Sequence, residues 1–289
     1  MGAHEASGEC VAAKTGHALI SLRGDDPDEE LRCEVTEAFE LVATTLRDPE
    51  KALCQDAAVV LDVCPGTLVT SVIDGMGGMA NGREAAQLAA SAFESIAPHS
   101  TSDAAIRSDI AAAFTRAHAD VVQHCPGGGA TAVAALVSKD WVQVLHAGDA
   151  EAIVISRSGR VRFRTVAHSP VGYARYAGVL DEEEALHHAE RHLVSNGLGV
   201  EGMSVHVSPR IPFANGDTLL VATDGVTDNA RESEIATTLR SGSLAVSTEQ
   251  LVRLCRDRMN RSLLVPPSTR DAIGKPDDLS LVTVRRRAR

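Results

Sequence analysis

Aromatic residues are scarce in this chain of 289 residues, where they make up 3% of the composition with one Trp and two Tyr. Hydrophobic residues nevertheless reach 44%, so the core has to be built mainly from Val, Leu, Ile and Ala. A charged fraction of 23% is ordinary for a globular protein. The composition therefore excludes a chain that is disordered throughout, and the length suits one large domain or two small ones.

Cysteine pairs and long apolar runs are also missing. The six cysteines include no Cys-x-x-Cys pair and are too sparse for a disulfide framework. No apolar run approaches the roughly 20 residues that span a bilayer. The stretch of residues 10–22 carries Lys14 and His17 and so lacks the apolar run of a secretory signal. We therefore expect reduced thiols, no membrane partner and a cytoplasmic location.

Positive charge is in short supply. Lys and Arg number 28 against 39 Asp and Glu, which gives a formal net charge of −11. Such a chain repels phosphate backbones, which argues against nucleic acid as a partner. If its substrate is an anion, something must reverse the charge locally.

The pattern of elements predicts one domain behind a leader. Residues 1–30 are rich in Gly, Ala and charge and are predicted to be a flexible leader, with a short strand at Ala18–Leu22. Residues 31–46 fit both helical spacing and strand alternation, and periodicity alone leaves the two open. Residues 31–289 contain no repeat and no linker rich in Pro or Ser, so we expect a single domain there.

Strands come in hairpins and helices come in pairs along the rest of the chain. The predicted strands cover residues 57–63, 67–73, 131–137, 141–146, 151–156, 160–165, 203–207, 218–222 and 279–284. The predicted helices cover residues 82–96, 102–124, 181–192, 232–240 and 248–261. This order lacks the strict alternation of a parallel sheet. It predicts an α+β fold, a four-layer αββα sandwich of two antiparallel sheets flanked by helix pairs.

Four aspartates stand at abrupt starts or ends of apolar strands. Asp56 and Asp277 precede strands, whereas Asp74 and Asp224 each end a strand and are each followed by Gly. A buried carboxylate is costly unless something positive compensates it. Divalent Mg²⁺ or Mn²⁺, which prefer oxygen ligands, would compensate a cluster of four. A single such residue reads more simply as a turn aspartate, but the repeated Asp-Gly weakens that interpretation.

Eight short segments follow one another along the chain, at residues 54–57, 72–86, 129–133, 147–150, 168–169, 196–199, 223–226 and 277–280. They include Asp74-Gly75-Met76-Gly77-Gly78, Gly148-Asp149, Thr223-Asp224-Gly225 and Asp277-Asp278. In these segments and in their order, the chain resembles the PPM family of metal-dependent Ser/Thr protein phosphatases (type 2C), in its bacterial form. The resemblance implies a β-sandwich flanked by helices and the hydrolysis of phosphoserine and phosphothreonine in proteins.

The resemblance also implies a role for each aspartate. Asp74 and the Gly75 carbonyl would be metal ligands, with Asp74 bridging two Mn²⁺ or Mg²⁺ ions. Asp224 and Asp277 would hold one ion, and Asp56 would help to hold the other through water. The ions would activate a water molecule for attack on phosphorus, without a phosphoenzyme intermediate. We expect a monomer acting on a phosphorylated protein.

The sequence departs from the family pattern at three places. Lys51 stands where the family has a phosphate-binding Arg, and Cys54 replaces an Asn. Lysine lacks the bidentate fork of arginine, so Arg47 is a competing candidate for phosphate binding. Met76 stands where many relatives have His. The acid that would feed a third metal is missing near Gly127, which makes that site doubtful, and Asp120 is the nearest acid.

Other readings of the same residues remain. The chain could be a non-catalytic relative that binds phosphopeptides or regulates a partner, or a phosphatase of a small phosphorylated metabolite. The glycines after Asp74 fit a dinucleotide fingerprint, but no parallel strand follows their helix. His188 and His192 have a metal-ligand spacing, but a solvated helix face explains them better. Asp149 is interpreted as a turn residue.

Overall fold

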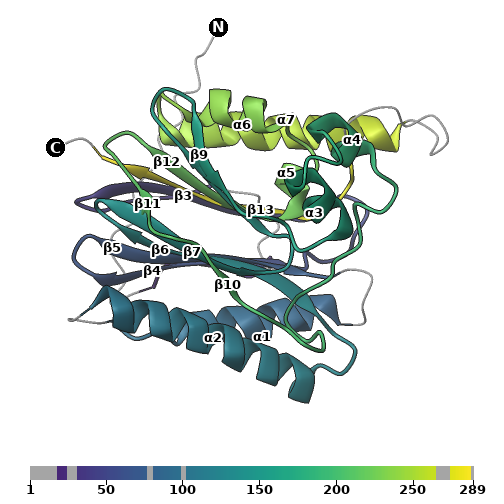
Figure 1. Cartoon of the computed structure of the whole chain (residues 1–289), viewed down its shortest axis with the longest axis horizontal. Coiled ribbons are helices and arrows are strands. Elements are labelled where there is room, and N and C mark those ends of the chain that lie inside the picture. Colours follow the sequence, from purple (N-terminus) through teal and green to yellow (C-terminus); the bar gives the residue numbers. More distant parts are fainter. Residues whose placement is uncertain (1–17, 25–30, 77–80, 99–101, 265–273, 288–289) are drawn as a thin grey trace, which may run out of the picture.

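Two antiparallel sheets stack face to face between layers of helices (Figure 1). The computed structural model describes residues 18–24, 31–76, 81–98, 102–264 and 274–287. Its strands are β1 (Ala18–Leu22), β2 (Arg32–Val35), β3 (Phe39–Leu46), β4 (Asp56–Cys64), β5 (Thr67–Gly75), β6 (Ala130–Ser138), β7 (Trp141–Ala147), β8 (Glu151–Ile155), β9 (Val161–Arg164), β10 (His206–Val207), β11 (Ile211–Pro212), β12 (Thr218–Ala222) and β13 (Leu279–Arg286). Its helices are α1 (Gly82–Glu94), α2 (Asp103–His124), α3 (Pro170–Tyr176), α4 (Glu182–His187), α5 (Asp224–Thr227), α6 (Glu232–Leu239) and α7 (Leu244–Leu263). This confirms the predicted four-layer αββα sandwich.

Each sheet joins segments that are distant in the sequence. The first sheet has the order β1-β4-β5-β6-β7-β10, with β11 also pairing with β7. The second has the order β2-β3-β13-β12-β8-β9. Strand β13, from the C-terminal part of the chain, therefore lies between β3 and β12 in the middle of its sheet.

Alternate side chains of β4 pack into two different hydrophobic clusters, one on each face of the sheet. Ala57, Val59 and Leu61 pack toward the helices α1 and α2. Ala58 and Val60 point the other way, into the cluster between the two sheets. Because successive side chains of a strand face opposite sides, a strand buried on both faces reads as the continuous apolar run seen in the sequence.

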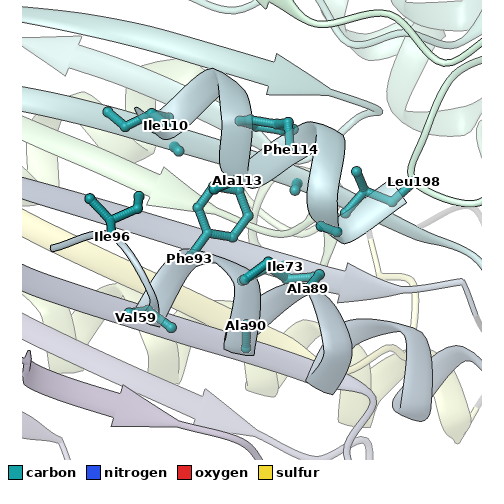
Figure 2. Close-up of a cluster of buried hydrophobic side chains, with 14 of the residues drawn as sticks. Val59, Ile73, Ala89, Ala90, Phe93, Ile96, Ile110, Ala113, Phe114 and Leu198 are labelled. Carbon is teal, nitrogen blue, oxygen red and sulfur yellow. The ribbon is translucent and has the colours of Figure 1, made fainter. Parts of the chain in front are cut away.

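The outer helices close the sandwich on both sides. On one side, Phe93 of α1 and Phe114 of α2 meet edge to face, with ring centroids 5.0 Å apart (Figure 2). On the other side, α6 and α7 cover the second sheet (Figure 1). The short helices α3, α4 and α5 gather at one end of the sandwich. That end carries the candidate site.

Most predicted elements are present, and several details differ. Residues 32–46 form the strands β2 and β3, which settles the ambiguity of that segment. The acidic helix predicted to reach residue 192 ends at His187, because His188 adopts an extended backbone. The strand predicted at 203–207 is reduced to β10. The helices α3 and α5 and the strand β11 were not predicted.

Part of the predicted leader belongs to the first sheet. Ala18–Leu22 forms the expected strand and pairs with β4 as an edge strand. The remainder of the leader, residues 1–17 and 25–30, lies outside the described residues. Within the described ranges, no helix is both long enough and apolar enough to cross a membrane.

Candidate functional site

The four aspartates singled out in the sequence converge at one end of the sandwich. Asp56 begins β4 and faces Asp74 of β5 across the ladder. Asp224 is the first residue of α5, directly after β12, and Asp277 lies two residues before β13. Strands β12 and β13 are neighbours in the second sheet. Each sheet therefore brings two of the aspartates to the same place.

A hydrogen bond joins the two pairs. Thr223, the residue before Asp224, donates from its hydroxyl to Oδ2 of Asp56 over 3.1 Å. The same hydroxyl accepts the backbone N–H of Ser280 over 3.0 Å. Thr223 thus holds the ends of β4, β12 and β13 together at the site.

The glycines that follow Asp74 and Asp224 are required by packing. A Cβ on Gly75 would lie 2.3 Å from the carbonyl oxygen of Gly82 and 2.6 Å from that of Gln55. A Cβ on Gly225 would lie 2.0 Å from the carbonyl oxygen of Asp278. Neither position has room for a side chain, so the repeated Asp-Gly reflects close approach of backbones around the carboxylates.

Burial and mutual repulsion raise the pKa values of most of these carboxyl groups. Asp56 is 2% exposed, and burial followed by the charges of Asp278 and Asp277 raises its pKa well above the ordinary value. Burial, and then the charges of Asp56 and Asp224, do the same to the pKa of Asp74. The pKa of Asp277 is also raised, by burial and by Asp224. A site that holds its acids this closely favours a compensating cation.

Three carboxylate oxygens in the cluster lack a hydrogen-bond partner among the described residues. They are Oδ1 of Asp56, Oδ1 of Asp224 and Oδ2 of Asp228, and all three atoms are buried. Buried polar atoms are nearly always satisfied, so an orphaned oxygen calls for an explanation. Carboxylate oxygens are the ligands that Mg²⁺ and Mn²⁺ prefer. The donor set therefore fits divalent cations.

Three further acids belong to the cluster. Burial and the charge of Asp224 raise the pKa of Asp149 to about 8, so its interpretation as a turn residue is incomplete. Asp228, the C-cap residue of α5, follows Asp224 by one turn. Burial raises its pKa to about 6, against the attraction of Lys275. Asp228 was missed, although its spacing of four from Asp224 places both on one helix face.

Asp278 is the third of these acids, and it orients a loop. Its carboxylate accepts the backbone N–H of Asp48 over 2.8 Å and that of Gln55 over 2.9 Å. These two bonds fix the segment that carries Lys51 and leads into Asp56.

Two lysines reach into the acidic cluster. Nζ of Lys51 lies 2.7 Å from Asp277 and 3.1 Å from Asp278. Nζ of Lys275 contacts Asp224 and lies 3.2 Å from Asp228 and 3.4 Å from Asp277. Burial alone would raise the pKa of Asp224, but Lys275 outweighs it and holds that pKa below its ordinary value. Lys275 was not singled out in the sequence, where only its place two residues before Asp277 hints at a role.

The other residues of the predicted phosphate site lie beside Lys51. Arg47 donates to the backbone carbonyl of Lys51 and is exposed. Cys54 is buried, and its thiol points to the carbonyl of Leu46 over 3.7 Å. Asp120, the acid considered for a third metal, lies on α2 in the helix layer outside the first sheet.

A cavity of about 250 Å³ opens beside the cluster. Asp149, Asp224 and Asp228 line it on one side, and residues of α3 and α4 line it on the other, including Arg175 and Tyr176. The cavity therefore borders three acids of the cluster.

Three histidines cluster nearby but do not form a ligand set. His146, His168 and His206 place ligand atoms within 4.8 Å of one another. However, Nδ1 of His168 accepts the N–H of Gly148 over 3.0 Å and the amide of Asn196 over 2.8 Å. The proton of neutral His168 must then sit on Nε2, and a protonated nitrogen cannot bind a metal. We therefore place the cation site at the aspartates.

Comparison with known proteins connects this arrangement to one family. The sequence model described as Protein phosphatase 2C matches residues 48–263, which is more than half of the chain. A serine/threonine phosphatase stp of Listeria welshimeri is 32% identical over 115 residues, or 40% of this chain and 45% of that protein. The serine/threonine protein phosphatase PstP of Mycobacterium tuberculosis is 27% identical over 199 residues, or 66% of this chain and 38% of that protein. The matches thus span less than half the length of these curated relatives.

Solved structures share the fold. A serine/threonine phosphatase of S. agalactiae superposes with a TM-score of 0.71 at 21% identity, covering 86% of this chain and 99% of that chain. The catalytic domain of PstP in complex with two manganese ions gives a TM-score of 0.66 at 20% identity, covering 87% of this chain and 99% of that chain. At these identities the likeness establishes the architecture of the sandwich.

Proposed function

The chain belongs to the protein phosphatase 2C family, and on that premise we propose that it hydrolyses phosphoserine and phosphothreonine esters in proteins with the help of two divalent cations, Mn²⁺ or Mg²⁺. The observation that carries this proposal is the convergence of Asp56, Asp74, Asp224 and Asp277 on one buried point with orphaned oxygens. The relatives described as serine/threonine phosphatases and the manganese-bound PstP structure support it.

We assign the proposed metal ligands to the two cations as follows from the resemblance. Asp74 would serve both ions, the carbonyl of Gly75 would be a further metal ligand, Asp224 and Asp277 would hold one ion, and Asp56 would help to hold the other through water. Bound cations would offset the charge of the phosphoryl oxygens and make water a nucleophile near neutral pH. This answers how a chain with a net charge of −11 binds an anion.

The remaining residues of the site bind and orient the substrate. Lys51 lies at the rim of the cluster, 29% exposed, where its ammonium can bind a phosphoryl oxygen as a point charge. The cavity beside Asp224 and Asp228 would receive the peptide that carries the phosphorylated residue. Water is the nucleophile in this scheme, so no phosphoenzyme forms.

The test is an assay of p-nitrophenyl phosphate and a phosphothreonine peptide with Mn²⁺, with and without a chelator. We expect turnover of both substrates that the chelator abolishes. Asp224→Asn should lower kcat by at least about 100-fold, the upper end of what a supporting residue near a metal costs. Asp103→Asn, at an exposed position on α2, is the matched control and should leave activity unchanged.

Other outcomes identify the rival functions. Turnover that is insensitive to the chelator, or full activity of Asp224→Asn, refutes the metal mechanism. Absence of turnover with both substrates points to a phosphopeptide-binding or regulatory module. Hydrolysis of a small phosphorylated metabolite alone points to a metabolic phosphatase.

The setting of the protein is part of the same proposal. We propose a single phosphatase domain that acts as a monomer in cytoplasmic signalling and reverses the phosphorylation of proteins. The acidic composition supports a partner other than nucleic acid.

A further inference from the structure

Lys275 places a positive charge inside the acidic cluster. Its ammonium contacts Asp224, Asp228 and Asp277 together, with separations of 3.2 Å to Asp228 and 3.4 Å to Asp277. The lysine side chain is 19% exposed and that of Asp224 is 14% exposed. Screening by water is therefore weak, and each of these contacts is stronger than a surface ion pair.

Two of these three partners are residues that would hold a cation. Asp224 and Asp277 belong to the proposed ligand set, whereas Asp228 does not. A carboxylate oxygen that faces an ammonium group cannot at the same time coordinate a divalent ion at close range. Lys275 contacts Oδ2 of Asp224 and Oδ2 of Asp277, while Oδ1 of Asp224 has no hydrogen-bond partner among the described residues. The lysine and the cation therefore draw on the same two carboxylates.

Hydrogen bonds to Asn229 hold the backbone of Lys275. Its N–H donates to Oδ1 of Asn229 over 2.9 Å, and its carbonyl accepts from Nδ2 of Asn229 over 2.9 Å. Asn229 is fully buried and also donates to the carbonyl of Gly225. The lysine is thus anchored beside the cluster, and its four-carbon side chain can turn away from Asp224 and Asp277 while keeping Asp228 as a partner.

We propose that Lys275 is a tethered cation that competes with one divalent ion for Asp224 and Asp277, so that the ion can bind only when the ammonium withdraws to Asp228. This inference rests on the proposed metal-dependent function. It makes Lys275 a residue that sets the metal concentration at which the site loads.

The test is calorimetric titration of the metal-free full chain with MnCl₂. Lys275→Met keeps the length of the side chain and removes its charge, so the dissociation constant for Mn²⁺ should fall by at least about tenfold, since one such pair is worth more than a decade. Lys275→Arg retains the charge and should stay near wild type. Lys139→Met makes the same charge change in the turn between β6 and β7, away from the site, and is the matched control.

A second measurement covers the case in which Lys275→Met folds poorly without metal. Thermal unfolding in chelator should show a lower Tm for Lys275→Met than for wild type, because the carboxylates lose their counter-charge. Saturating Mn²⁺ should then raise the Tm of this variant more than that of wild type, since only in wild type is the lysine displaced.

The outcomes separate this inference from the function on which it rests. Wild type that binds Mn²⁺ together with a variant of equal or weaker affinity overturns the role of Lys275 alone. Mn²⁺ binding by neither protein overturns both proposals. Binding by Lys275→Met but not by wild type supports the competition.

Discussion

The hydroxyl of Thr223 donates to Oδ2 of Asp56 over 3.1 Å and so ties the second sheet to the first at the point where the carboxylates meet. Oδ1 of the same carboxylate lacks a hydrogen-bond partner among the described residues. Thr223 therefore links the two sheets beside the acids, as the bond from the Gln55 N–H to Asp278 also does.

Thr223→Val should therefore destabilise the protein. It removes the donor to Asp56 and the acceptor of the Ser280 N–H, and leaving buried polar groups unsatisfied costs about 1–3 kcal/mol. Urea unfolding measures the change. Thr70→Val is the matched control, because the Thr70 hydroxyl is buried on β5 without a partner among the described residues. A loss of stability as large in the control would contradict the role of the Thr223 bond.

The metal-free protein should lose stability as the pH rises from about 4 to about 8. The folded pKa of Asp149 is about 8, above the value of about 3.9 expected for the unfolded chain. The folded state then binds more protons, so the stability is fully present below the unfolded pKa and is lost as the pH passes the folded one.

Thermal unfolding in chelator at pH 5, 6, 7 and 8 checks this dependence. Asp149→Asn should flatten the decline, and saturating Mn²⁺ should reduce it because the cation compensates the charged acids. A Tm that does not change with pH in chelator would show that the carboxylates are compensated in another way.

Gly225→Ala should disturb both stability and metal binding. Its Cβ would meet the carbonyl of Asp278 at 2.0 Å, and overpacking of this kind costs about 1–3 kcal/mol. The backbone at Asp278 would have to move to relieve this contact, and Asp277 would move away from Asp224 with it. The affinity for Mn²⁺ should therefore fall together with the stability. Both are measured on one sample, by urea unfolding and by calorimetry.

Gly202→Ala is the comparison for this variant. Nothing lies within 4 Å of a Cβ at Gly202, although its positive φ of 76° makes the substitution costly in the backbone. It should lower stability modestly and leave Mn²⁺ affinity unchanged. Equal Mn²⁺ affinity in Gly225→Ala and wild type would show that the tight contact does not position the ligands.

Lys51 and Arg47 should differ in their effect on substrate binding. Lys51 lies on the carboxylates of Asp277 and Asp278, whereas Arg47 donates to a backbone carbonyl. Lys51→Met should raise KM for p-nitrophenyl phosphate by roughly tenfold, the loss of one charge-assisted hydrogen bond. Arg47→Met should leave KM within about twofold of wild type. The reverse order would assign phosphate binding to Arg47.

The sequence was most informative where chemistry and turn geometry coincide. Asp74-Gly75 and Asp224-Gly225 each end an apolar strand, so both the ligand type and its place at a sheet edge were predictable. The segment of β3 was ambiguous because nearly all of it is buried. A strand covered on both faces loses the alternation that distinguishes it from a helix.

Other parts of the site depend on contacts between distant segments. Asp149 and Asp228 join the cluster only because β7, β8 and α5 come together, and each alone resembles an ordinary turn or helix residue. The role of Lys275 was equally unpredictable from the local sequence, because its partners Asp224 and Asp228 are about 50 residues away in the chain. The spacing of residues within one motif carries no information on contacts between distant segments.

The position of β13 has a consequence for the order in which the protein is made. This strand fills the gap between β3 and β12, so the second sheet stays split until the ribosome has released residues 279–286. Asp277 lies two residues before this strand, so it is synthesised together with it and joins the site when the strand joins the sheet. A nascent chain that lacks this segment has neither a complete sheet nor a full set of acids, and acquires both at once when synthesis passes it.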